Sequence, residues 1–191
     1  MSLALPPSYF ERVYQDTDDP WGFESRWYEQ RKYALSLAAL PKPRYTRAFE
    51  PGCAIGVLSA LLAPRCDELI ASELHPRVAE AARARLASFP HVRVDTAAIP
   101  DAWPDGSFDL LVMSEVLYYL THEGWRVLVT RINESTRSGA HLLAVHYRGE
   151  TDYPQKAESV HTRLQTLREW KQVAHYEEPS FLLDVLERSE P

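Results

Sequence analysis

Cysteine is nearly missing from this chain: Cys53 and Cys66 are the only two among 191 residues. Two thiols make neither a disulfide framework nor a zinc ligand set, so we expect no metal site. A chain of this length can bury a sufficient hydrophobic core without either device. A reducing cytoplasm is the compartment that fits this composition best.

Long apolar runs and an excess of positive charge are missing as well. No apolar run reaches membrane-spanning length, and Pro6 and Pro7 interrupt the start of the chain too early for a signal peptide. The net charge of -6 argues against nucleic acid as a partner. With 45% hydrophobic and 25% charged residues, the sequence predicts one soluble globular domain.

Short apolar segments alternate with helical stretches from Tyr45 onward, which is the pattern of βαβ units in a doubly wound α/β fold with a mostly parallel sheet. Pro76 suits the first turn of a helix, and Ser138-Gly139 marks a helix stop. The predicted strands are 46–50, 68–73, 91–95, 108–114 and 140–147, and the predicted helices are 56–63, 76–88 and 122–137.

The two ends of the chain depart from this alternation. Residues 1–40 are rich in aromatic side chains, and helical spacing over 24–40 predicts a helical cap ahead of a main domain at 41–191. At the other end, a predicted helix at 156–169 precedes two strand-like segments, 171–178 and 181–187. Pro179-Ser180 links these segments tightly, so we expect an antiparallel hairpin.

One short segment has the spacing of a nucleotide-cofactor loop: Phe49-Glu50-Pro51-Gly52-Cys53-Ala54-Ile55-Gly56. The dinucleotide fingerprint requires glycine at its first, third and sixth positions, where this chain has Gly52, Ala54 and Val57. Glu50 would repel a pyrophosphate and attract an ammonium or sulfonium cation. The loop therefore favours a cationic cofactor without pyrophosphate. The alternative is a helix-capping Glu50 followed by ordinary turn glycines.

A second acid stands where a nucleoside would need it. Glu73 ends the apolar run Leu69-Ile70-Ala71, and its carboxylate offers two acceptor oxygens for a pair of ribose hydroxyls. The two segments together resemble class I S-adenosylmethionine-dependent methyltransferases. That resemblance implies S-adenosyl-L-methionine as cofactor and a sheet of seven strands in the order 3-2-1-4-5-7-6.

The same resemblance assigns further positions around the cofactor. Gly52, Cys53, Ala54 and Gly56 would form its loop, and Leu74 would lie near the adenine face. The family usually has an Asp after strand three, and this chain has no acid at the matching position. Backbone amides of Ala98 or Ile99 would then serve the adenine edge, unless Asp95 shifts into that place.

Three segments narrow the resemblance to the nodulation N-methyltransferases. These segments are Asp19-Pro20-Trp21, the loop from Phe49 to Gly56, and Ser114-Glu115-Val116-Leu117-Tyr118-Tyr119-Leu120. Members of that family methylate the free amine of a deacetylated glucosamine unit on a chitin-oligosaccharide precursor. The resemblance covers roughly residues 18 to 125, so it implies an amino-sugar or other saccharide-like small acceptor less firmly than it implies the cofactor.

Methyl transfer to an amine requires alignment and a group that takes a proton. Ser114 and Glu115 end the predicted fourth strand, at the edge where ligands bind in open α/β sheets. Glu115, Tyr118 or Tyr119, and His146 are the candidate proton acceptors or amine binders. The alternatives are packing roles for the two tyrosines and a structural role for His146.

The predicted cap supplies two further candidates. Arg31 could pair with the methionine carboxylate of the cofactor, and Trp21 could place an aromatic face against a sulfonium or a sugar ring. Tyr28 and Tyr33 share the same helix, where aromatic residues more often pack in a core.

Three functions remain open on the sequence alone. The leading one is N-methylation of an amino-sugar-like acceptor. The second is O-methylation of a small hydroxylated metabolite, and the third is a cofactor-binding module without catalysis. A preference for NAD would overturn the interpretation of Glu50. The oligomeric state is not predicted.

Overall fold

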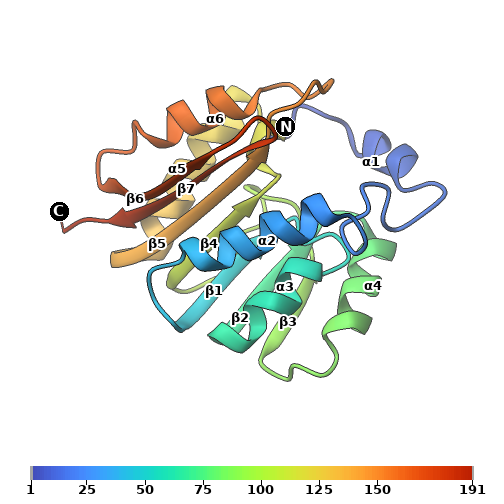
Figure 1. Ribbon diagram of the computed structural model, residues 1–191, viewed down its shortest axis with the longest axis horizontal. Coiled ribbons are helices and arrows are strands. Elements are labelled where there is room, and N and C mark those ends of the chain that lie inside the picture. The colour runs from blue at the N-terminus through green and yellow to red at the C-terminus, as the bar shows by residue number, and fades with distance from the viewer. Residues whose placement is uncertain (1, 191) are drawn as a thin grey trace.

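The computed structural model describes residues 2–190 and contains one seven-stranded sheet with the order β3-β2-β1-β4-β5-β7-β6 (Figure 1). Strands β1 to β5 run parallel, and β7 is antiparallel to both β5 and β6. The predicted fold class and strand order are confirmed. The strands are Tyr45–Pro51 (β1), Cys66–Glu73 (β2), Val92–Thr96 (β3), Phe108–Ser114 (β4), Thr136–Tyr147 (β5), Trp170–Glu177 (β6) and Phe181–Arg188 (β7).

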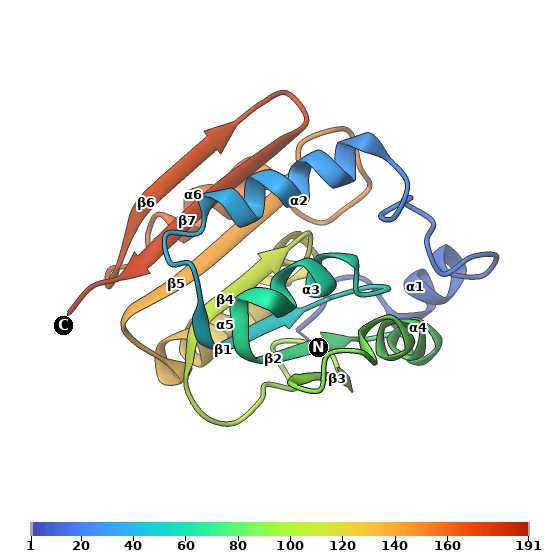
Figure 2. The same cartoon turned by 60° about the horizontal axis from the view of Figure 1, so that its bottom comes forward.

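Helices cover both faces of this sheet. In Figures 1 and 2, α2, α3 and α4 lie on one face, and α5 and α6 lie on the other. The helix α1 lies at the side of the molecule, and Figure 2 shows it next to α4. The helices are Pro7–Val13 (α1), Trp27–Ala39 (α2), Val57–Leu62 (α3), Pro76–Leu86 (α4), His122–Ser135 (α5) and Ala157–Leu164 (α6), and the 3-10 turns are Ala63–Arg65 (η1) and Leu117–Tyr119 (η2).

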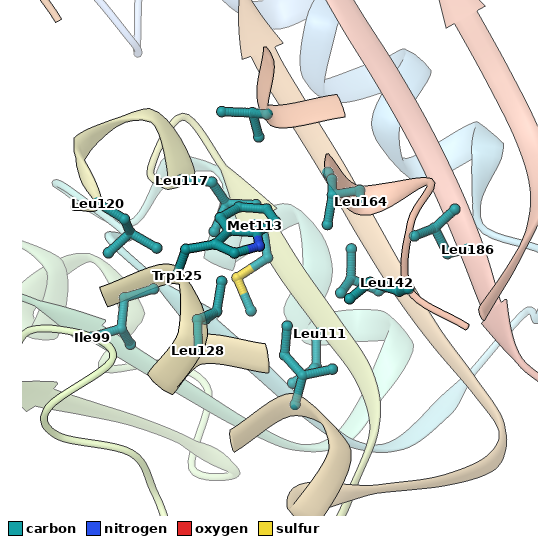
Figure 3. Packing of buried hydrophobic residues seen from close by; sticks show 14 of the residues in the cluster. Ile99, Leu111, Met113, Leu117, Leu120, Trp125, Leu128, Leu142, Leu164 and Leu186 are labelled. Carbon is teal, nitrogen blue, oxygen red and sulfur yellow. The ribbon is translucent and has the colours of Figure 1, made fainter. Parts of the chain in front are cut away.

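The alternation of β4 divides the core between the two faces. Leu111 and Met113 belong to a buried cluster with Trp125 and Leu128 of α5 (Figure 3). Leu110 and Val112 belong to a second cluster, together with residues of α2 and α3. Because successive side chains of a strand point to opposite faces, one apolar run supplies both layers.

Several predicted boundaries differ from the structure. The helix α5 ends at Ser135, and the predicted stop at Ser138-Gly139 lies inside β5. Gly139 has φ +78° next to a register shift between β4 and β5, so this glycine accommodates a strand irregularity instead of ending a helix. The helix α6 ends at Leu164, five residues earlier than predicted, because turns at 164–170 lead into β6.

The N-terminal stretch differs as well. The helix α2 begins at Trp27 rather than at 24, because the Asp19 carboxylate accepts the backbone N–H groups of Phe23 and Glu24 and fixes a turn there. The short helix α1 was not predicted separately. Within residues 2–190, no helix combines the length and apolar character that crossing a bilayer requires.

Candidate active site

A cavity of about 480 Å³ opens at the carboxyl ends of the parallel strands. Gly52 follows β1, Glu73 ends β2, Ala97 follows β3, and Glu115 follows β4, and all four line the cavity. This is the edge of an open α/β sheet where ligands bind. A smaller pocket of about 30 Å³ shares Gly52 and Glu115 with it.

The loop after β1 is fixed by its own backbone and by a buried acid. Gly52 and Cys53 donate their N–H groups to the carbonyl of Ser72, at 2.7 and 2.9 Å. Gly52 has φ +71°, and a side chain there would collide with Val116. Glu50 is buried, and burial raises its pKa to about 7 although Ser59 donates a 2.6 Å hydrogen bond to it. The loop thus lines the cavity at Gly52 and Ala54 and places the desolvated Glu50 in the smaller pocket beside it.

Glu73 lies at the mouth of the same loop. Its two carboxylate oxygens accept the N–H of Ala54 at 3.1 Å and the N–H of His75 at 2.8 Å. Burial raises the pKa of Glu73, and these backbone hydrogen bonds oppose the rise. Each oxygen still has one acceptor position left, so the carboxylate suits two neighbouring hydroxyl groups.

Three residues that the resemblance places near the adenine also line the cavity: Leu74, Ala98 and Ile99. Their contact with a cofactor stays a prediction. Asp95 does not line the cavity, because its carboxylate is held by Arg93 at 3.0 Å on the exposed side of β3. The backbone at Ala98 and Ile99 is therefore the part of this segment that can meet a ligand.

Glu115 lines both the cavity and the smaller pocket, and three donors contact its carboxylate. One carboxylate oxygen accepts from Lys32 Nζ at 2.6 Å. The other accepts from the Tyr118 hydroxyl at 2.6 Å and from the Tyr147 N–H at 2.9 Å. Glu115 has φ +58°, an uncommon conformation for a side-chain-bearing residue, and these three donors stabilise it.

Lys32 is the centre of a buried ion cluster that the sequence analysis missed. Its ammonium, on a side chain only 1% exposed, contacts Glu29 at 2.8 Å as well as Glu115, and it lies 5.1 Å from the ring centroid of Tyr28. Burial alone would lower the pKa of Lys32, but Glu115 and Glu29 outweigh burial and raise it. The spacing of Glu29 and Lys32 on one helix face was the available signal.

Tyrosine rings form much of the remaining wall. The rings of Tyr118 and Tyr153 are 4.7 Å apart, those of Tyr119 and Tyr153 are 4.9 Å apart, and Tyr147 packs edge-on against Tyr28 at 6.0 Å. Burial raises the pKa of Tyr118 well above its usual value, so its hydroxyl keeps its proton. The tyrosines give this side flat apolar faces with polar edges.

The N-terminal part of the chain also contributes to the cavity wall, with lining residues between Leu3 and Lys32. Trp21 lines it, as predicted, and its ring packs edge-on against Tyr14 at 5.5 Å. Arg26 lines the cavity too, and within residues 2–190 no ion pair or side-chain hydrogen bond engages its guanidinium. Arg26 precedes α2 and was outside the candidates drawn from helical spacing.

Not all predicted site residues reach the cavity. Arg31 pairs with Glu178 at 2.6 Å and Tyr176 at 2.8 Å, because its position on α2 directs it to the β6–β7 hairpin instead of the cofactor loop. His146 is fully buried in β5, behind the cavity wall. Cys53 and Ser114 line only the smaller pocket, and Gly56 caps α3 against Leu86.

A family model described as "Nodulation protein S (NodS)" matches residues 10–142, which is more than half of the chain. The chain belongs to the nodulation protein S family. Nodulation protein S of Bradyrhizobium diazoefficiens is 36% identical over 104 residues, covering 54% of this chain and 50% of that protein. The Rhizobium tropici protein is 30% identical over 128 residues, covering 66% and 54%.

Solved structures agree with this family membership. The N-methyltransferase NodS of Bradyrhizobium japonicum WM9, in complex with S-adenosyl-L-homocysteine, superposes with a TM-score of 0.85 at 26% identity, covering 96% of this chain and 98% of that one. A Pseudomonas syringae protein assigned to the methyltransferases is 44% identical with a TM-score of 0.76, covering 85% and 100%.

The resemblance that the sequence indicated is thereby confirmed. The chain is a member of the nodulation protein S family and has the Rossmann-like fold of class I methyltransferases. The chain spans about half the length of the curated relatives it matches.

Proposed function

We propose that this chain is an S-adenosylmethionine-dependent N-methyltransferase that acts on an amino-sugar-like acceptor. The observation that carries the proposal is a cavity lined by two acids in different surroundings. Glu73 lines it beside the glycine loop, and Glu115 lines it beside Lys32 and the tyrosines. Glu50 and Glu115 both border the smaller pocket next to it. The Glu73 side suits the cofactor, and the tyrosine side suits an acceptor.

The residues present fit the cofactor. Glu73 would accept the ribose hydroxyls, Leu74 and Ile99 would enclose the adenine, and the small pocket beside Glu50 would take the methionine end. Arg26 is better placed than Arg31 to meet the cofactor carboxylate, because it lines the cavity without an ion pair among the described residues. The cofactor supplies a methyl group bonded to positively charged sulfur, so the protein must align an acceptor and receive a proton.

The acceptor wall has a route for that proton. The Tyr118 hydroxyl donates to Glu115, which leaves the phenol oxygen with acceptor capacity of its own. An acceptor N–H can donate to this oxygen while the Tyr118 proton moves to Glu115. Lys32 holds the Glu115 carboxylate in place at 2.6 Å. A protonated amine must lose a proton to expose its lone pair, and this pair is placed to take a proton from an acceptor.

The tyrosine rings favour a saccharide carrier for that amine. Sugar rings present C–H faces and hydroxyl edges, and Tyr28, Tyr147 and Tyr153 present matching flat faces and polar edges. The nodulation N-methyltransferase resemblance implies the same class. The free thiols Cys53 and Cys66 suit a reducing cytoplasm.

An acceptor panel tests the proposal. The enzyme, labelled cofactor, and either a glucosamine oligomer, its fully acetylated form or a hydroxylated aromatic metabolite would be incubated and analysed by mass spectrometry. We expect one methyl group on the free amine of the glucosamine oligomer. Methylation of hydroxyl groups alone would support the O-methyltransferase alternative, and S-adenosylhomocysteine binding without any methylation would support the non-catalytic module.

Tyr118→Phe is the matched variant for the proton route. Loss of the hydroxyl removes the link between acceptor and Glu115, so we expect kcat to fall by roughly a hundredfold, the range of general acid-base catalysis. Tyr153→Phe serves as the control, because it keeps the aromatic ring in the cavity wall and leaves the hydrogen bond between Tyr118 and Glu115 in place. Equal rates for both variants would contradict the assigned route.

A further inference from the structure

A buried chain of hydrogen bonds runs behind the cavity wall, and the proton route above does not use it. Leu117 N–H donates to His146 Nε2 at 3.2 Å, His146 Nδ1 lies 3.1 Å from His161 Nε2, and His161 Nδ1 lies 2.7 Å from Asp184 Oδ2. The three side chains are 0%, 3% and 0% exposed. They come from β5, α6 and β7.

The direction of every bond in this chain is fixed by its two ends. A backbone N–H can only donate, so His146 Nε2 must accept, and the single proton of a neutral His146 must lie on Nδ1. Burial holds the pKa of His146 well below its usual value, which keeps this ring neutral. His161 Nε2 therefore accepts, and its Nδ1–H donates to Asp184.

The acid end is anchored by the hairpin. Asp184 Oδ1 also accepts from His175 at 2.6 Å and from Gln172 at 3.1 Å, both on β6. Burial would raise the pKa of Asp184, but the bonds from His161 and His175 outweigh it and keep the pKa below its usual value. The carboxylate thus remains an acceptor at the base of the chain.

The His146 end of the hydrogen-bond chain holds the turn η2, which carries Tyr118 of the cavity wall. Leu117 begins η2, the turn has no side-chain cap, and His146 accepts one N–H that would otherwise be unpaired. The His146 ring also packs against the Tyr118 ring at 5.1 Å. One residue thus supports both the backbone and the ring next to the Tyr118 hydroxyl, which bonds Glu115.

We propose that His146, His161 and Asp184 form a positioning chain that sets the place of Tyr118 and Glu115 for acceptor methylation. It rests on the proposed function for its effect on catalysis. His146 is a positioning residue here, because it acts through Leu117 and Tyr118 and does not line the cavity. We expect cofactor binding to be independent of this positioning chain, because its contacts lie on the tyrosine side.

Two amide variants separate the two bonds of His146. A glutamine amide reaches the place of Nε2, so His146→Gln keeps an acceptor for Leu117. An asparagine amide reaches the place of Nδ1, so His146→Asn keeps a hydrogen-bond partner for His161. It removes the acceptor of the Leu117 N–H. We expect the Leu117 amide to exchange with deuterium about 5- to 150-fold faster in His146→Asn, as loss of a buried hydrogen bond of about 1–3 kcal/mol implies.

Kinetics complete the test. In His146→Asn we expect kcat for the glucosamine oligomer to fall by about tenfold or more with an unchanged Kd for S-adenosylhomocysteine, and we expect His146→Gln to recover most of it. Equal losses in both variants, or an unchanged rate in His146→Asn, would overturn the proposal. An inactive wild-type enzyme would contradict the proposed function instead, and amide exchange would still test the bond to Leu117.

A measurement on the wild-type protein covers the case in which the variants do not fold. Nitrogen-15 chemical shifts distinguish the two tautomers of histidine. We expect His146 and His161 both to carry their proton on Nδ1, the direction required by the chain. A proton on His146 Nε2 would overturn the proposal without any variant.

Discussion

Ionisation of Glu50 in the ligand-free protein costs free energy, because its carboxylate is buried. Its pKa is raised to about 7 by burial, and Ser59 is its one hydrogen-bond partner among the described side chains. When folding raises the pKa of an acid, its protonated form adds to the stability of the folded state. This contribution is complete at pH values below the pKa that the acid has in the unfolded chain. That advantage is lost as the pH rises through about 7.

Glu50→Gln should therefore change how stability depends on pH. We expect the variant to be more stable than the wild type at pH 8, by up to roughly 3 kcal/mol, because it removes a desolvated charge. The difference should shrink toward pH 4.5 and below. Urea unfolding at several pH values measures it, with Glu80→Gln on the exposed side of α4 as the control. An identical pH dependence in wild type and Glu50→Gln would contradict this account.

The same substitution should act in the opposite sense on the ligand. An ionised Glu50 favours the ammonium of the cofactor, so Glu50→Gln should weaken S-adenosylhomocysteine binding by about 1.5–3 kcal/mol, the range of a hydrogen bond to a charged group. A variant that gains stability and loses affinity has lost a functional charge. Unchanged affinity would assign Glu50 a structural role alone.

The positions of side chains around the cavity were predicted unevenly. Glu50, Glu73 and Gly52 could be placed because a short loop and a strand end fix their geometry within a few residues of the sequence. Lys32 and Arg26 could not, because their places depend on how α2 packs against strands far away in the chain. Lys32, for example, meets Glu115 across 83 positions.

At the scale of elements, the turn after β1 depends on one glycine. Gly52 has φ +71°, and its missing side chain leaves room for Val116, which lies between β4 and η2. Gly52→Ala would add both a collision and backbone strain of about 1–3 kcal/mol. We expect lower stability together with at least tenfold weaker S-adenosylhomocysteine binding, about 1.4 kcal/mol, since the loop lines the cavity.

Gly56→Ala is the matched control for this prediction. Gly56 also has a positive φ, +77°, but it lies outside the cavity lining and packs beside Leu86. Thermal unfolding should show a loss of stability in both variants, and calorimetry should show a loss of affinity mainly in Gly52→Ala. Equal losses of affinity would mean that the loop does not contact the ligand directly.

Element boundaries show where local signals stop being sufficient. Pro76 placed the start of α4 correctly, because the fixed φ of proline acts within one turn. Ser138-Gly139 misplaced the end of α5, because the conformation of Gly139 is set by pairing between β4 and β5. Tertiary pairing thus decided a boundary that local propensity did not.

At the scale of the whole molecule, strand order explains why the site lies where it does. The parallel strands β2, β1 and β4 are neighbours, so their carboxyl ends bring Glu73, Gly52 and Glu115 to one edge (Figure 1). The order was predicted from the resemblance to class I methyltransferases, and the βαβ alternation with a terminal hairpin agrees with that order. The sequence predicted a helical cap at 1–40, but it did not predict the aromatic contacts at the cavity wall, such as that between Tyr14 and Trp21.

Titration calorimetry of the wild-type protein with S-adenosylhomocysteine and, separately, with NAD tests the central claim most directly. The account predicts one S-adenosylhomocysteine per chain, and weaker binding in Glu73→Gln by about 1–3 kcal/mol because one ribose acceptor becomes a donor. It predicts no binding of NAD, whose pyrophosphate Glu50 would repel. Binding of NAD in preference to S-adenosylhomocysteine would contradict the account.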